Sequence, residues 1–382
     1  MKEKIQKAFT EKFGREPFIT ITTPGRANLI GEHIDYQGGY VLPVGVDRFI
    51  FSCGRKRKDN KIKLFSFNYN QYFETDTEHI IYQKKYKWAN YILGVLEEYK
   101  KIGYEISGME IAIGGNIPVG SGLSSSAAVE ISIAVLFQKI TGIEIEPLEL
   151  IKLARRAENE FVGVSCGIMD QFSIYLSKKD NALLINCKTL EYKYAPLLMN
   201  GLKFLLVDTK KERSLSSSVY NSRVASVKEA VMAIRQYRDI EFLTDLDDIT
   251  LYKDKLSEET YKRALHIVEE NKRVLDAVSC LEKNDFNGFG QLMYQSHKSL
   301  KDLYEVSCEE LDFIVGFGKN IEGVKGARLT GAGMGGCALV LLEENIISQF
   351  ISELTSLYKK TFGINPEFYL FQPVDGALYQ NP

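Results

Sequence analysis

The sequence contains no long hydrophobic run. Its longest apolar stretches, such as residues 131–137 and 338–342, fall far short of the ~20 residues that a membrane-spanning helix needs. The first 18 residues are rich in lysine and arginine but lack the apolar region of a secretory signal, so they predict a surface helix. We therefore expect a cytoplasmic protein that has no membrane partner.

Paired cysteines and an excess of one charge are also missing. The six cysteines form no C-x-x-C pair and have no histidine at zinc-ligand spacing, which predicts reduced thiols. Because 48 Lys and Arg stand against 50 Asp and Glu, the net charge of -2 gives no general attraction for nucleic acid. Any polyanion that the protein binds must be held by a local site.

Proline is scarce, and the glycines form no repeat. Nine prolines, 30 glycines and a hydrophobic fraction of 45% exclude a collagen-like or disordered chain. Since one hydrophobic core usually stops growing at ~250–300 residues, a chain of 382 residues predicts two domains. The change to mostly helical segments places the boundary near residue 200, which gives domains 1–200 and 201–382.

Strand and helix signals alternate along the chain. Runs rich in β-branched and aromatic residues predict strands at 18–23, 49–54, 61–67, 109–113, 182–187, 204–208, 338–342 and 367–371. Helical periodicity predicts helices at 88–101, 147–162, 216–238, 258–289 and 347–361, and a buried helix that ends near residue 139. The first strand is expected to stop at Pro24-Gly25, before a polar loop over residues 26–39. Glu158 falls on the apolar face of its helix and therefore needs a partner.

The run Gly120-Ser-Gly-Leu-Ser-Ser-Ser-Ala-Ala128 is built like a phosphate-binding loop. Glycines let the backbone curl, and hydroxyls follow at a helix start, where free N–H groups and the helix dipole favour an anion. The run lacks the lysine of a Walker A loop. The alternative is that the serines only cap a buried helix.

A second glycine run, residues 331–336, formally satisfies the G-x-G-x-x-G pattern of dinucleotide-binding proteins. That fingerprint needs a helix after the glycines, whereas residues 337–342 read as a strand. We therefore assign this run a structural role, the close approach of a backbone loop to the active site.

Two other segments gather polar groups. Residues 24–39 place Arg, Glu, His and Asp between glycines, a set that suits a polyhydroxylated ligand but also an ordinary surface loop. Asp170 stands alone among apolar residues in 166–171, where a turn or cap role is the simple alternative. His79, His266 and His297 have no patterned neighbours and are expected to be structural.

Together these segments resemble those of the GHMP small-molecule kinases, and residues 26–39 are similar to the galactokinase signature. The likeness runs from about residue 18 to the C-terminus and includes 158–161, 167–171, 216–223 and 303–309. It implies an α+β, two-domain GHMP kinase fold. The N-terminal domain would have a mixed sheet and the C-terminal domain a ferredoxin-like fold, with the active site between them.

The resemblance also implies a role for each matching residue. Asp170 would face the C1 hydroxyl of galactose as base or positioning group, and Arg26 would pair with it and neutralise the transferring phosphoryl group. The sugar would be bound by Glu32, His33, Ile34, Asp35 and Tyr220, with Glu32 at the C6 hydroxyl. The ATP phosphates would be held by Gly120, Ser121, Gly122, Leu123, Ser124, Ser125 and Ser126, with Ser66 near the nucleotide. Mg²⁺ would be held by Ser126 and Glu158.

The implied reaction converts ATP and D-galactose to α-D-galactose 1-phosphate and ADP in a monomer or weak homo-oligomer. The sequence departs from the family after Arg223, where Val224 and Ala225 replace the usual Arg and acidic residue, and at Met334 and Cys337. These changes leave open a kinase for a related sugar, such as N-acetylgalactosamine, galacturonic acid or L-arabinose. A non-catalytic sugar and ATP sensor is the rival from another class.

Overall fold

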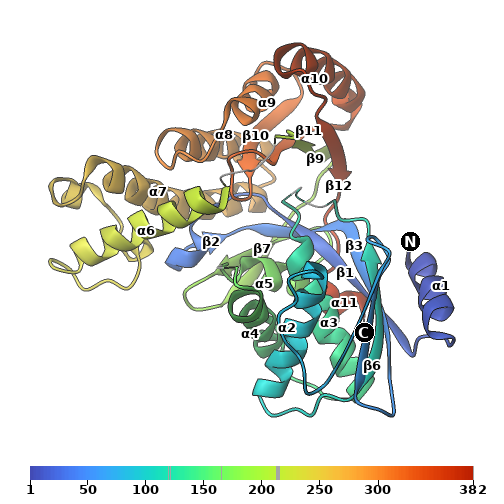
Figure 1. Cartoon of the computed structure of the whole chain (residues 1–382). Coiled ribbons are helices and arrows are strands. Elements are labelled where there is room, and N and C mark those ends of the chain that lie inside the picture. The colour runs from blue at the N-terminus through green and yellow to red at the C-terminus, as the bar shows by residue number, and fades with distance from the viewer. Residues whose placement is uncertain (119, 121, 165, 212–215, 382) are drawn as a thin grey trace.

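The computed structural model describes residues 1–118, 120, 122–164, 166–211 and 216–381. They form two parts that share no β-sheet, as Figure 1 shows. No helix in these residues is long and apolar enough to span a membrane.

The first part contains a five-stranded sheet, in the order β1-β3-β6-β4-β5, and a smaller sheet, in the order β2-β7-β8. Because β4 pairs with β6 in parallel and the other neighbours are antiparallel, the large sheet is mixed. The strands are β1 (Ile19–Asn28), β2 (Tyr40–Val41), β3 (Pro43–Lys56), β4 (Lys61–Ser66), β5 (Gln71–Asp76), β6 (Met109–Gly115), β7 (Asn181–Asn186) and β8 (Tyr192–Pro196).

Helices cover both faces of the large sheet. The N-terminal surface helix buries Ile5 and Phe9 in a small cluster with Phe51 and Cys53 of β3. Ser52, which points to the other face, is hydrogen-bonded to Ser132 of the buried helix α3. The helices of this part are α1 (Lys2–Phe13), α2 (Lys87–Lys101), α3 (Ser125–Thr141), α4 (Pro147–Arg156) and α5 (Met169–Leu176), with a π-helical turn η2 (Ala157–Val162) directly after α4.

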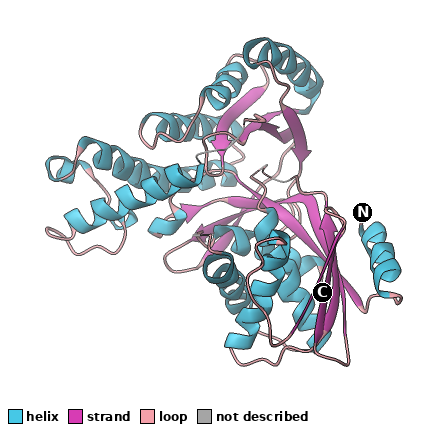
Figure 2. Ribbon diagram, viewed as in Figure 1, coloured by secondary structure: helices cyan, strands magenta, loops and turns pink. Residues whose placement is uncertain are grey.

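The second part has a four-stranded sheet in the order β10-β11-β9-β12, with helices α8 and α9 packed on it and α10 packed against α9 (Figures 1 and 2). Helices α6 and α7 pack together and extend to the side. The strands are β9 (Leu202–Asp208), β10 (Val324–Thr330), β11 (Cys337–Glu343) and β12 (Glu367–Phe371). The helices are α6 (Ser216–Ile234), α7 (Glu258–Glu282), α8 (Phe286–Asp302), α9 (Glu309–Lys319), α10 (Ile347–Phe362) and α11 (Ala377–Gln380).

The chain crosses back to the first part at its C-terminus. Helix α11 packs on β1 and α5, and Asn381 exchanges hydrogen bonds with the backbone of Thr22. The last strand of the first part, β8, ends at Pro196, and the first strand of the second part, β9, begins at Leu202. The domain boundary near residue 200 stays a prediction.

The first strand is longer than the sequence predicts. Strand β1 runs through Pro24 and Gly25 to Asn28, with its register against β3 shifted between those two residues. Proline is tolerated at such a bulge because the ladder is interrupted there. Arg26 therefore stands on a strand, not in a loop.

Two predicted helices also differ. The segment 258–289 is divided between α7 and α8, and the segment 147–162 becomes a π-helical turn from Ala157 onward. A π-helical turn has no signature in hydrophobic periodicity, although such turns are frequent at functional sites.

Candidate active site

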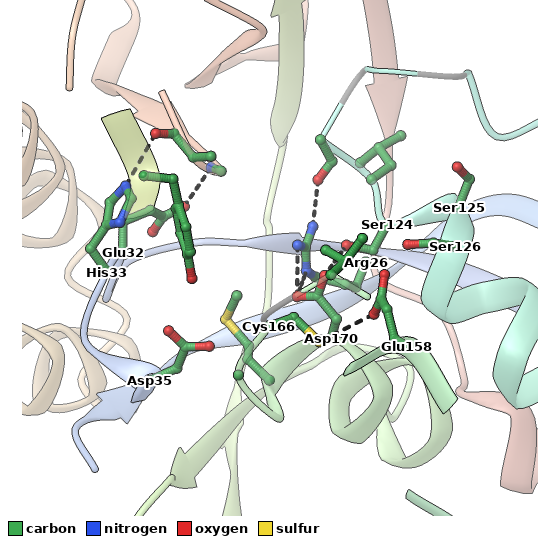
Figure 3. Close-up of a pocket in the computed structure, with 18 of the residues that line it drawn as sticks. Arg26, Glu32, His33, Asp35, Ser124, Ser125, Ser126, Glu158, Cys166 and Asp170 are labelled. Carbon is green, nitrogen blue, oxygen red and sulfur yellow. Dashed lines mark hydrogen bonds and ion pairs between the residues drawn. The ribbon is translucent and has the colours of Figure 1, made fainter. Parts of the chain in front are cut away.

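A cavity of about 560 Å³ lies where the two parts meet. It is lined by the loop after β1, the glycine-serine run, the residues around the start of α5, helix α6 and the loop after β10. Figure 3 shows the labelled side chains in two groups, with Glu32, His33 and Asp35 on one side and Ser125, Ser126 and Glu158 on the other. Arg26 and Asp170 lie between the groups.

Arg26 and Asp170 form the central ion pair. Arg26 donates from Nε and Nη2 to Asp170 Oδ1 at 2.8 and 2.7 Å, and its Nη1 donates to the carbonyl oxygen of Gly122. Such a charge-assisted fork fixes the orientation of the carboxylate. Arg26 is buried, and its hydrogen bond to Gly122 connects β1 to the glycine-serine run.

The glycine-serine run has the geometry of an anion site. Gly120 and Gly122 have φ of 80° and 77°, which favours glycine, and α3 begins at Ser125, so its first N–H groups and the positive end of its dipole face the cavity. Ser124 has φ of 52°, and its hydroxyl donates to Asp170 Oδ2. Strained backbone of this kind is typical of functional sites. The phosphate loop and the central carboxylate are thus directly linked.

Glu158 is buried on the π-helical turn, so the predicted inward orientation of its side chain is confirmed. Burial, followed by the charge of Asp170, raises its pKa, while hydrogen bonds from Cys166, Ser126 and Gln171 oppose that rise. A carboxylate and a hydroxyl oxygen at the mouth of a phosphate loop are hard donors of the type that Mg²⁺ prefers. The described residues contain no cluster of three or more metal-binding side chains, and Mg²⁺ held by one or two protein oxygens plus substrate phosphates needs none.

Glu32 is the centre of a buried network. Its Oε2 accepts from Asn28 Nδ2 at 2.5 Å and Arg328 Nη2 at 2.7 Å, and its Oε1 accepts from Thr330 Oγ1 and the Gly331 N–H, both at 2.9 Å. Arg328 is fully buried on β10, and it was not singled out from the sequence. The network joins the loop after β1 to β10 and holds Glu32 at the wall of the cavity.

Both ring nitrogens of His33 are engaged. Nε2 lies 3.2 Å from the carbonyl oxygen of Ala332, which can only accept, so Nε2 carries the proton and Nδ1 accepts from the hydroxyl of Tyr36 at 3.2 Å. Burial lowers the pKa of His33 to about 3, and the ring is therefore neutral. His33 thereby connects the loop after β1 to the second glycine run, which approaches the cavity as expected.

Asp35 lies against the backbone before α5. A Cβ atom at Gly167 would stand 1.7 Å from Asp35 Oδ2, so only glycine allows this contact. Burial, followed by the charge of Asp170, raises the pKa of Asp35 to about 6. Tyr220 of α6 completes this side of the cavity. Asp35 and Tyr220 are therefore placed where a polyhydroxylated ligand could reach them.

The structure brings most of the predicted residues to the cavity, with three exceptions. Ile34 is buried in the hydrophobic core and does not line the cavity, and Ser66 is buried at the end of β4, outside the lining. Ser121 lies outside the described residues. Tyr36 and Cys166 also line the cavity. Both lie inside segments that were named from the sequence, but neither was given a role there.

Three family profiles match the chain. They are described as the galactokinase galactose-binding signature, over residues 7–56, the GHMP kinases N terminal domain, over residues 90–178, and the GHMP kinases C terminal domain, over residues 277–360. The matched ranges include Arg26 and the loop after β1, the glycine-serine run, and Asp170.

Curated relatives match over nearly the whole chain. The galactokinase of Clostridium tetani is 43% identical, covering 98% of this chain and 96% of its own length, and that of Thermotoga maritima is 41% identical, covering 94% and 99%. The crystal structure of Lactococcus lactis galactokinase complexed with galactose is 36% identical and covers 98% of both chains, with a TM-score of 0.94. A mevalonate kinase structure at 23% identity and a TM-score of 0.69 shares the fold.

Proposed function

The chain belongs to the galactokinase family of the GHMP kinases, and we propose that it transfers the terminal phosphoryl group of ATP to the C1 hydroxyl of D-galactose. The products are α-D-galactose 1-phosphate and ADP. One observation carries this proposal: the Arg26–Asp170 pair stands between a polar sugar-loop wall and a phosphate-type loop (Figure 3). A central pair in this position faces both substrates at once.

Asp170 receives the C1 hydroxyl in this account. Its carboxylate is held by Arg26 on one oxygen and by Ser124 on the other, so it can orient the hydroxyl without moving. Phosphoryl transfer needs little covalent help and much charge stabilisation. We therefore rank positioning and electrostatics by Asp170 and Arg26 above full proton abstraction.

The other side of the cavity binds ATP. The N-terminus of α3 and the glycines before it hold the phosphates, and Ser126 and Glu158 hold Mg²⁺. When bound, Mg²⁺ neutralises charge on the phosphate oxygens. Across the cavity, Asp35, Tyr220 and the wall formed by Glu32 and His33 bind the sugar hydroxyls.

Replacing Glu158 with Gln is expected to raise the Mg²⁺ concentration needed for half-maximal activity by on the order of 10-fold. The amide keeps the shape but binds a hard cation more weakly than a carboxylate does. Excess Mg²⁺ should restore part of the activity in a kinase assay run at fixed ATP. An unchanged Mg²⁺ requirement would remove Glu158 from the metal site.

Asp35 is expected to make galactose binding dependent on pH. Since the pKa of Asp35 is raised to about 6, the carboxylate is charged at neutral pH and takes up a proton as the pH falls through that value. The neutral acid loses acceptor capacity for sugar hydroxyls, so KM for galactose should rise below about pH 6. Asp35→Asn should have a high KM that no longer changes over this range. Parallel pH profiles for the two proteins would contradict this role.

The preference among sugars tests the part of the proposal that concerns Glu32. L-arabinose lacks the C6 hydroxymethyl group of galactose, so a site built to accept the C6 hydroxyl loses a partner, and kcat/KM should favour galactose by on the order of 10²-fold. Glu32→Gln should narrow this ratio. Gln is preferred to Ala here, because its amide oxygen can still accept a hydrogen bond from Arg328, whereas Ala would leave that buried guanidinium without an acceptor at position 32. Equal use of both sugars by the unaltered protein would remove Glu32 from the sugar site.

A further inference from the structure

Glu130 is a buried carboxylate that the roles assigned so far do not use. It lies on α3, four residues after Ser126, in a helix whose following residues, such as Ile131 and Ile133, belong to the core. Its side chain is fully buried, and its Oε1 is a buried oxygen without a hydrogen-bond partner among the described residues. Since burying a carboxylate is costly and an apolar residue would suit this position, its presence calls for a function.

The partner of Glu130 is Gln171, the residue after Asp170. Gln171 Nε2 donates to Glu130 Oε2 at 3.0 Å and to Glu158 Oε2 at 2.7 Å. Both amide hydrogens are thus used on carboxylates from two different elements, α3 and the π-helical turn. Glu158 lines the cavity, whereas Glu130 and Gln171 do not, so this bridge of three side chains runs from the cavity wall into the interior.

The bridge places two buried acids close together. Burial, followed by the charge of Glu158, raises the pKa of Glu130 well above its usual value, and burial raises that of Glu158 as well. The amide of Gln171 lies between the two carboxylates and donates to both of them without adding charge. Because Gln171 donates in its hydrogen bond to residue 130, that residue must supply an acceptor oxygen.

We propose that Glu130 is a positioning residue of the phosphoryl-transfer site, which fixes the Glu158 carboxylate, through the Gln171 amide, in the orientation that holds Mg²⁺. The inference rests on the metal role proposed for Glu158. It assigns no contact between Glu130 and the cation. Groups of this kind, one shell behind a metal ligand, typically change metal affinity or activity by about 10- to 100-fold when removed.

The test compares Glu130→Leu, Glu130→Gln and Gln171→Leu with Glu158→Gln. Ser132→Ala is the matched control, since Ser132 is a buried polar residue of the same helix that bonds to Ser52, away from the cavity. For each variant, calorimetry measures the affinity for ADP with and without Mg²⁺, and kinase assays give the Mg²⁺ requirement. The gain in ADP affinity on adding Mg²⁺ reports the metal site independently of turnover.

We expect Glu130→Leu and Gln171→Leu each to reduce this Mg²⁺-dependent gain by about 10-fold, and we expect the same of Glu158→Gln. A variant that combines Glu130→Leu with Gln171→Leu should lose no more of the Mg²⁺-dependent gain than either single variant, because both changes break the same bridge. Glu130→Gln keeps an acceptor oxygen and should remain within about 3-fold of the unaltered protein, as should Ser132→Ala.

If Glu130→Leu or Gln171→Leu kept the normal Mg²⁺-dependent gain in ADP affinity while Glu158→Gln lost it, the inference about Glu130 would be overturned. The proposed metal role of Glu158 would still stand. A loss in Glu130→Gln as large as that in Glu158→Gln would also overturn the inference, because the charge of Glu130 would then be the feature that matters. If Glu158→Gln itself kept normal coupling, the proposed metal site would fall and the inference with it. If Glu130→Leu does not fold, Gln171→Leu decides between these results.

Discussion

Replacing Asp170 with Asn is expected to lower kcat by at least about 10²-fold while galactose affinity changes much less. The amide keeps the shape of the side chain, but it neither carries the charge that pairs with Arg26 nor accepts a proton from the C1 hydroxyl. General base effects contribute about 10²- to 10⁴-fold, and electrostatic positioning adds to them. Steady-state kinetics and calorimetric titration with galactose in the absence of ATP separate turnover from binding.

Asp180→Asn makes the same chemical change at an exposed turn and should leave kcat unaltered. A variant of Asp170 that retained more than about a tenth of normal kcat would contradict its assignment, given the size of general base effects. A loss confined to KM would instead show that Asp170 binds the sugar without taking part in the transfer.

Replacing Arg26 with Met is expected to reduce kcat by about 10³-fold or more. A positive group beside the transferring phosphoryl is worth about 10³- to 10⁵-fold in other phosphotransferases. Arg26 also orients Asp170 and contacts the carbonyl of Gly122, so its loss disturbs two parts of the site at once. Kinetics at saturating ATP and galactose measure the effect, and thermal unfolding shows whether the variant is folded.

Arg26→Lys is the control for this prediction. Lysine restores the charge but lacks the planar fork that donates to Asp170 and to Gly122 together, so it should recover only part of the lost rate. Full recovery would show that charge alone is required. An Arg26→Met variant within about 10-fold of the normal rate would exclude the transition-state role, since that role predicts at least about 10³-fold.

Many residues of the site could be predicted from the sequence, because those within each motif stand close together in the chain. The glycine-serine run could be recognised because its glycines signal a curved backbone and its serines signal the start of a helix. Glu158 was detectable because a carboxylate on an apolar helix face needs a partner. The second glycine run could be separated from a dinucleotide site because strand β11 follows it.

The remaining features depend on contacts between distant segments. The buried Arg328 pairs with Glu32, which lies 296 positions earlier in the chain, and no local sequence pattern predicts that pair. The continuation of β1 through Pro24 depends on a bulge that β3 permits. The Glu130–Gln171–Glu158 bridge joins three elements, and its only sequence signal is the carboxylate of Glu130 in a mostly apolar helix.

Formation of galactose 1-phosphate is the measurement that tests the central claim most directly. The purified protein is incubated with ATP, Mg²⁺ and D-galactose, and phosphorus NMR follows the products, in parallel with N-acetylgalactosamine, galacturonic acid and L-arabinose. We predict equal amounts of α-D-galactose 1-phosphate and ADP, a preference for galactose, and a nearly inactive Asp170→Asn variant. Faster reaction with another of these sugars, or binding of galactose and ATP without any phosphorylated product, would contradict the account.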